Sequence, residues 1–185
     1  MSLTETDRAA REALRARQGT GARYDAPNAP AEDLLLARRG AAFFARKLNE
    51  LSDADFDAPS LRDGWSRRHL IADVSYRARA MAIALKGIRD GLTEEEAEWR
   101  PDVALAATLP VRALRYLYEH SDVHLNVEFR DLRPQDWDGK VHLGEDDPVV
   151  VRMLPRARAR AIWCAAIDLG SGASKREIPD SLVFD

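Results

Sequence analysis

The stretch from residue 64 to residue 81, GWSRRHLIADVSYRARAM, constrains the fold of this chain more than any other. Ser66 is placed to accept a hydrogen bond from the first turn of a helix, and the fifteen residues after it contain no glycine or proline. Apolar residues recur there at helical spacing: Leu70, Val74, Ala78 and Met81. The stretch therefore predicts an amphipathic helix with one side against a core.

A single acidic residue, Asp73, lies beside this apolar stripe, and Arg77 follows it one helical turn later. Residues four apart share one side of a helix, so we expect an ion pair between them. An acid in this position is either a solvated boundary residue or part of a functional site. The residues alone leave both interpretations open.

Three further segments have helical periodicity, over residues 31–51, 110–132 and 149–169, and the helix around Asp73 extends to residue 89. Pro155 predicts a kink or a later start for the last helix. The sequence therefore predicts an all-α fold, a four-helix bundle with crossover connections. The Asp-Gly pair in WDGKVHL predicts a minor hairpin.

The chain divides into two predicted parts. Residues 1–30 form an N-terminal arm, with a short charged helix at 4–17 followed by a linker rich in glycine and proline. Residues 31–185 form the helical bundle domain. The arm is too polar on all sides to belong to the core.

Composition excludes several classes of function. A net charge of −3 and the lack of a basic patch argue against nucleic-acid binding, and no apolar run is long enough to span a membrane. The N-terminus lacks the apolar segment of a signal peptide, so we expect a cytoplasmic protein. The one cysteine, Cys164, lies within a predicted helix with no adjacent base, and we interpret it as a buried structural thiol.

Two histidines, His120 and His124, are four residues apart and share a helix face. This is the spacing of a two-histidine metal clasp, and two acids, Glu119 and Asp122, flank the pair. An exposed polar helix surface explains the same pattern, and the spacing alone does not separate the two.

Three segments also follow the order of a known family. The first has an acidic turn, Pro-Ser, Gly-Trp-Ser and an early histidine, here Asp53, Asp55, Pro59, Ser60, Gly64, Trp65, Ser66 and His69. The second, LRPQDWDGKVHL, has a tryptophan ahead of a short strand, and the third is ARAIWCAAIDLGSG. Together they resemble the metal-binding domain of the mycothiol-dependent maleylpyruvate isomerase family, part of the DinB-like four-helix superfamily.

The resemblance implies a divalent metal such as zinc, held by two histidines and a glutamate, and a low-molecular-weight thiol. It places the three ligand positions at Asp73, Ala161 and Ala165. Alanine offers no lone pair to a metal, so we expect no metal or other cofactor in this chain. The expected pocket at the former metal site is lined by Asp73, Arg77, Ala161 and Ala165.

Two hypotheses of different class follow. The first is a thiol-dependent cis–trans isomerase or thiol transferase for a small anionic substrate, keeping a metal through Asp73 with His120 or His124. The second is a non-catalytic, metal-free bundle that binds a small ligand or serves in oligomerisation, for example as a homodimer. Whether the chain is an enzyme, and which substrate or thiol it takes, stays open. Both hypotheses expect Trp65 and Trp163 in the core.

Overall fold

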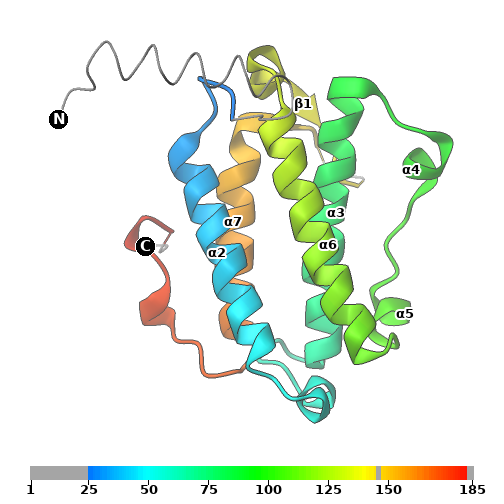
Figure 1. Cartoon of the computed structure of the whole chain (residues 1–185), viewed down its shortest axis with the longest axis vertical. Helices are drawn as coiled ribbons and strands as arrows, with labels where there is room; N and C mark the ends of the chain where they lie inside the picture. Colours follow the sequence, from blue (N-terminus) through cyan, green and yellow to red (C-terminus); the bar gives the residue numbers. More distant parts are fainter. Residues whose placement is uncertain (1–24, 145–146, 183–185) are drawn as a thin grey trace, which may run out of the picture.

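The computed structural model describes residues 25–144 and 147–182, and four long helices dominate it (Figure 1). They are α2 (Ala31–Asn49), α3 (Arg67–Asp90), α6 (Val111–Asp131) and α7 (Leu154–Asp168). The predicted all-α four-helix bundle is confirmed. The helix expected at 4–17 lies outside the described residues.

Helices α2 and α7 run parallel and pack closely against each other. Near their first turns Arg156 forms an ion pair with Asp33, and further along Nε1 of Trp163 donates to the carbonyl oxygen of Leu36 at 3.1 Å. Gly40 lies under the indole ring: a Cβ at this position would be 2.8 Å from Trp163. The absence of a side chain at Gly40 therefore permits the close approach of the two helices.

Helices α3 and α6 are also parallel to each other. At their N-terminal ends Arg68 Nη1 donates to the carbonyl oxygen of Leu109, and at their C-terminal ends Arg89 forms an ion pair with Glu128. Parallel neighbours cannot be joined by a tight turn, so a long crossover connects them. This places the α2–α7 pair antiparallel to the α3–α6 pair, as Figure 1 shows.

The crossover contains two short helices, α4 (Glu94–Glu98) and α5 (Val103–Ala107). Thr93 and Glu96 form the capping box that begins α4. Lys86 of α3 pairs with Glu96 and so fastens the crossover to the bundle.

The small hairpin is present, but its turn differs from the prediction. Strand β1 (Lys140–Val141) pairs with β2 (Val149–Val150) in antiparallel register, Lys140 opposite Val150. Asp138 and Gly139 precede β1 and do not form the turn. Because β2 and a short 3-10 turn take up residues 149–153, α7 begins at Leu154, later than 149, with Pro155 in its first turn.

Five short 3-10 helices complete the described chain. They are η2 (Asp53–Asp57), η3 (Pro134–Asp138), η4 (Val151–Met153), η5 (Lys175–Glu177) and η6 (Asp180–Leu182). Three of them, η2, η3 and η5, begin with a capping box, so the loops that contain them have their backbone donors satisfied locally.

The core extends through the whole length of the bundle. Trp163 is 7% exposed, as predicted, and stacks on Phe43 with 4.9 Å between ring centroids. Trp65 is only partly buried, so the prediction of a largely buried ring is wrong there. It precedes α3 in a surface loop, where the guanidinium of Arg62 covers its ring. No helix in the described part of the chain combines the length and apolar character needed to cross a bilayer.

Candidate functional site

The carboxylate of Asp73, in the first half of α3, is held between two arginines. Arg77 Nε donates to both carboxylate oxygens at 2.9 Å, and Arg62 Nη1 donates to Oδ2 at 3.1 Å. Asp73 is 7% exposed, whereas the Arg77 and Arg62 side chains are 62% and 37% exposed. The predicted Asp73–Arg77 ion pair is confirmed, with the acid at the buried end.

Arg62 is the member of this cluster that sequence reasoning missed. It lies in the loop before α3, where no helical spacing relates it to Asp73. The backbone N–H of Ser60 donates to the carbonyl oxygen of Trp65 at 2.8 Å and closes the loop, and the N–H of Leu61 donates to that of Asp168 at 2.6 Å. These bonds tie the loop to the end of α7. The tertiary fold therefore places Arg62 beside Asp73. In the sequence, Gly-Trp-Ser marks the loop but does not indicate this contact.

Ala161 and Ala165, where the resemblance places the other two ligands, lie one turn apart on α7, which packs against α3. Ala161 is exposed and Ala165 is 3% exposed, so this pair lies at a boundary between core and surface. Cys164 is exposed, and its interpretation as a buried structural thiol is wrong. The core side of α7 is occupied by its neighbours Trp163 and Ala165, and the helix turns Cys164 away from it.

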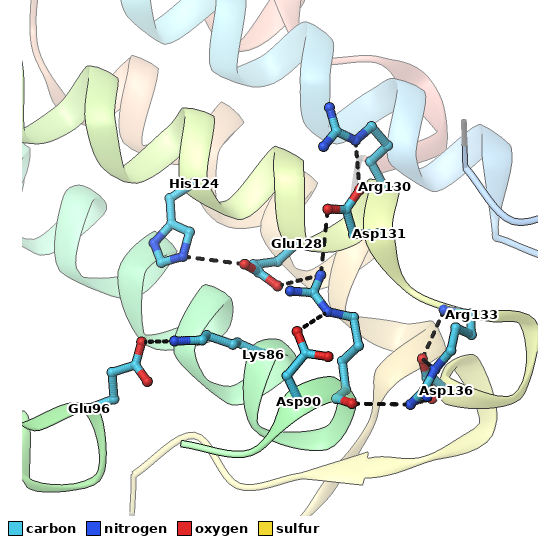
Figure 2. A network of polar contacts seen from close by, with 10 residues as sticks. Lys86, Asp90, Glu96, His124, Glu128, Arg130, Asp131, Arg133 and Asp136 are labelled. Carbon is cyan, nitrogen blue, oxygen red and sulfur yellow. Dashed lines mark hydrogen bonds and ion pairs between the residues drawn. The ribbon is translucent and has the colours of Figure 1, made fainter. Parts of the chain in front are cut away.

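The two histidines of α6 have different partners. His120 is exposed and stacks on Tyr116 with 5.6 Å between ring centroids. His124 Nε2 lies 3.5 Å from Oε1 of Glu128, one turn further along α6 (Figure 2). The structure therefore does not bring the histidines together with Asp73, whose partners are both arginines.

Glu128 belongs to a charged network that joins the C-terminal ends of α3 and α6. Its other oxygen lies 2.9 Å from Nη1 of Arg89, and Arg89 also bonds Asp90 and approaches Asp131 (Figure 2). Arg130 in turn bonds Asp131. With Glu128 6% exposed and Arg89 13% exposed, this is a largely buried, paired network that holds two helix ends in register.

Within residues 25–144 and 147–182, no three His, Cys, Asp or Glu side chains are grouped as they would be around a metal ion. A metal held by Asp73, His120 and His124 would require both histidines to leave their present contacts and Asp73 to leave its two arginines. The arrangement around Asp73 is instead a carboxylate neutralised by two guanidinium groups.

Four helices in two parallel pairs joined by a crossover define a bundle of the DinB-like class. The chain belongs to the mycothiol maleylpyruvate isomerase N-terminal domain family, whose model matches residues 37–170.

Two solved structures are similar over most of the chain. The crystal structure of the mycothiol-dependent maleylpyruvate isomerase has a TM-score of 0.73 and 33% identity. That of a mutant with one histidine replaced by alanine has a TM-score of 0.74 and 33% identity. In both cases the match covers 82% of this chain and 65% of the other, so this chain matches somewhat less than two thirds of those proteins. A search of curated proteins found no significant match.

Proposed function

We propose that this chain is a metal-free member of the family that binds a small anionic ligand at the Asp73 cluster. One observation carries the proposal: both oxygens of Asp73 accept hydrogen bonds from guanidinium groups, at 2.9 Å from Arg77 and 3.1 Å from Arg62. A carboxylate so engaged has two positive charges where a divalent cation would have to bind.

The donor set at the aligned positions does not fit a metal. Zinc takes thiolate, imidazole and carboxylate ligands, usually three from the protein at a catalytic site. Ala161 and Ala165 carry methyl groups and offer none of these. Among the three residues, only Asp73 has a side chain that can bind a metal. A cation there would be repelled by Arg62 and Arg77 at close range.

The same cluster suits an anion. Arg77 uses Nε on Asp73, and no partner is found for its two terminal amino groups in the described part of the chain. Asp73 holds the Arg77 side chain at its base, so less conformational entropy is lost when a ligand binds. A planar guanidinium edge matches a carboxylate in bidentate geometry. We therefore assign to Arg77 the recognition of a ligand carboxylate, and to Asp73 the positioning of Arg77.

Metal content and anion binding test this proposal together. Elemental analysis of protein purified without chelator should find well under one equivalent of zinc or any other divalent metal. Titration with malonate, a small dicarboxylate, should give binding that Arg77→Gln weakens and Arg39→Gln, an exposed arginine of α2, leaves unchanged. One equivalent of bound metal, or malonate binding insensitive to Arg77→Gln, would overturn the proposal.

The alternative is that this chain retains the activity named for its structural relatives, and the family match favours it. In that case the protein supplied with zinc and mycothiol should isomerise maleylpyruvate, and Asp73→Ala should abolish the activity. A rate equal to that of mycothiol alone would reject this alternative.

A further inference from the structure

A groove of about 530 Å³ lies between α2 and α6, and no member of the Asp73 cluster lines it. The α2 wall carries four alanines, Ala37, Ala41, Ala42 and Ala45, opposite larger side chains of α6. Helices α2 and α6 contact each other far less than the two parallel pairs do. The groove exists because methyl side chains on α2 cannot fill the space between separated helices.

Arg158, from α7, lines this groove and is 3% exposed. Its Nη1 donates to the carbonyl oxygen of Val74 at 3.2 Å, and its Nη2 to Oδ1 of Asp122 at 3.3 Å. Within the described residues its Nε has no partner. Charge-assisted hydrogen bonds are normally about 2.7–2.9 Å long, so this buried cation is poorly satisfied. Such a group calls for a ligand, an ion or water.

The other charged groups of the groove are better satisfied or exposed. Arg115 donates to the carbonyl oxygens of Leu48 and Leu51 at 2.7 Å, and Arg38 is paired with Asp25. Two arginines are thus already bonded, one near each end of the groove, whereas Arg158 between them keeps a buried Nε without a partner in the described part of the chain.

The hydroxyl of Tyr118 does not compete for a ligand head group. It donates to the carbonyl oxygen of Ala41 at 2.8 Å, and burial raises its pKa, so it stays neutral. The acids of the groove, Glu119 and Asp122, are on α6. Asp122 is 29% exposed and can turn towards solvent when a ligand takes its place on Arg158.

We propose that this groove binds a monocarboxylate with an unbranched apolar chain. The carboxylate replaces that of Asp122 on Nη2 of Arg158, and a shift of the Arg158 side chain brings the buried Nε onto its second oxygen. The apolar chain lies along the alanines of α2. The volume is within the range of about 300–1,000 Å³ for small-molecule sites. From Leu34 to Leu48 the wall rises about 21 Å at about 1.5 Å per residue, enough for a chain of eight carbons or more. The proposal does not depend on the function assigned to Asp73.

Octanoate and octanol, observed by NMR of protein labelled at alanine methyl groups, test the proposal. Octanoate should shift the methyl signals of Ala37, Ala41, Ala42 and Ala45 and leave those of Ala161 and Ala165 in place. Octanol lacks the charge that Arg158 recognises and should bind at least about tenfold more weakly, because bonds between charged groups are about twice as strong as neutral ones.

A matched pair of variants removes the site without touching Arg158. Ala42→Phe places a ring in the groove from an exposed position, whereas Ala157→Phe adds the same ring at an exposed position of α7 outside it. Octanoate binding should be lost in the first and kept in the second. Absence of shifts at millimolar octanoate, equal affinity for octanol, or unchanged binding by Ala42→Phe would overturn the proposal. Malonate should leave the four groove signals unshifted, which separates this site from that at Asp73.

Discussion

Arg62 reaches across from a loop to a helix: its Nη1 lies 3.1 Å from Oδ2 of Asp73, while its guanidinium carbon lies 4.6 Å from the centre of the Trp65 ring. The aromatic ring and the carboxylate therefore fix this guanidinium together. Loop and helix are joined at the position where the resemblance places a metal ligand, and a bound cation would have to displace an interaction that orders the loop.

This geometry predicts that Asp73→Ala lowers the unfolding free energy by an intermediate amount. The carboxylate is 11% exposed, but its two partners are 37% and 62% exposed and can hydrate once it is removed. The loss in unfolding free energy should be about 1–3 kcal/mol, the usual contribution of hydrogen bonds to charged groups. It should fall short of the about 3–5 kcal/mol for breaking a fully buried ion pair.

Chemical denaturation of Asp73→Ala measures this loss, and Asp63→Ala, which removes an exposed acid from the loop that carries Arg62, is the control. The control should change stability by less than about 0.5 kcal/mol. A loss of less than about 0.5 kcal/mol for Asp73→Ala would mean that the cluster contributes nothing to the fold.

Replacing a glycine by alanine should have opposite effects on stability at two positions within long helices. Gly40→Ala puts a Cβ 2.5 Å from Cγ2 of Ile162 and 2.8 Å from the indole of Trp163. Neither is the free end of a flexible side chain, so the packing of α2 on α7 must shift. Overpacking of this kind costs about 1–3 kcal/mol and outweighs the helix propensity gained. Thermal melts should therefore show Gly40→Ala less stable than the parent.

Gly87→Ala is the matched control in α3. Its Cβ would meet only the side chain of Leu92, at 3.2 Å, and Leu92 is 44% exposed and free to move aside. Here the gain in propensity, up to about 1 kcal/mol, should dominate. If both variants lowered the melting temperature equally, packing at Gly40 would not be the cause.

Glu96 should make part of the stability pH-dependent. Its hydrogen bond with Lys86, together with those to Thr93, lowers its pKa from 4.5 to about 2. Because the folded state binds the proton less tightly than the unfolded state, the stabilisation is complete above about pH 4.5 and is lost as the pH falls towards 2. The pair is near the surface, so we expect about 1 kcal/mol or less.

Comparison with Glu96→Gln isolates this effect, since every other acid titrates in both proteins. The difference in denaturation midpoint should be largest near neutral pH, shrink below pH 4.5 and decrease in high salt, which screens exposed pairs. A difference that stays constant down to pH 2 would show that the carboxylate charge plays no part.

The sequence predicts this fold well because its signals are local. Apolar periodicity defines four helices, and the spacing of Asp73 and Arg77 predicts their ion pair. What it misses depends on tertiary contacts. Arg62 meets Asp73 because a loop is tied to α7, and Cys164 is exposed because of the angle at which α7 packs on its neighbours. Predicting the groove at Arg158 requires knowing which helices are separated in the fold. The helical pattern of the sequence carries no such information.

The last prediction follows from the ligand positions that the family resemblance assigns. If Asp73, Ala161 and Ala165 stand at the three ligand positions, then Asp73→His, Ala161→Glu and Ala165→His made together should create a divalent metal site. Ala161 is exposed and can accept a glutamate without strain. Ala165 is 3% exposed, so a histidine there must displace neighbours, and the variant should lose some stability that zinc restores.

Zinc titration should give about one equivalent bound to the triple variant and a rise in melting temperature that chelator reverses. Arg62 and Arg77 lose their carboxylate partner in this variant, so adding Arg77→Asn, which removes one nearby positive charge, should raise the zinc affinity further. The variant with only Ala161→Glu and Ala165→His keeps Asp73 between its arginines and should bind zinc more weakly. Equal zinc affinity in the triple variant and the parent would contradict the placement of the metal ligands on which the proposed function rests.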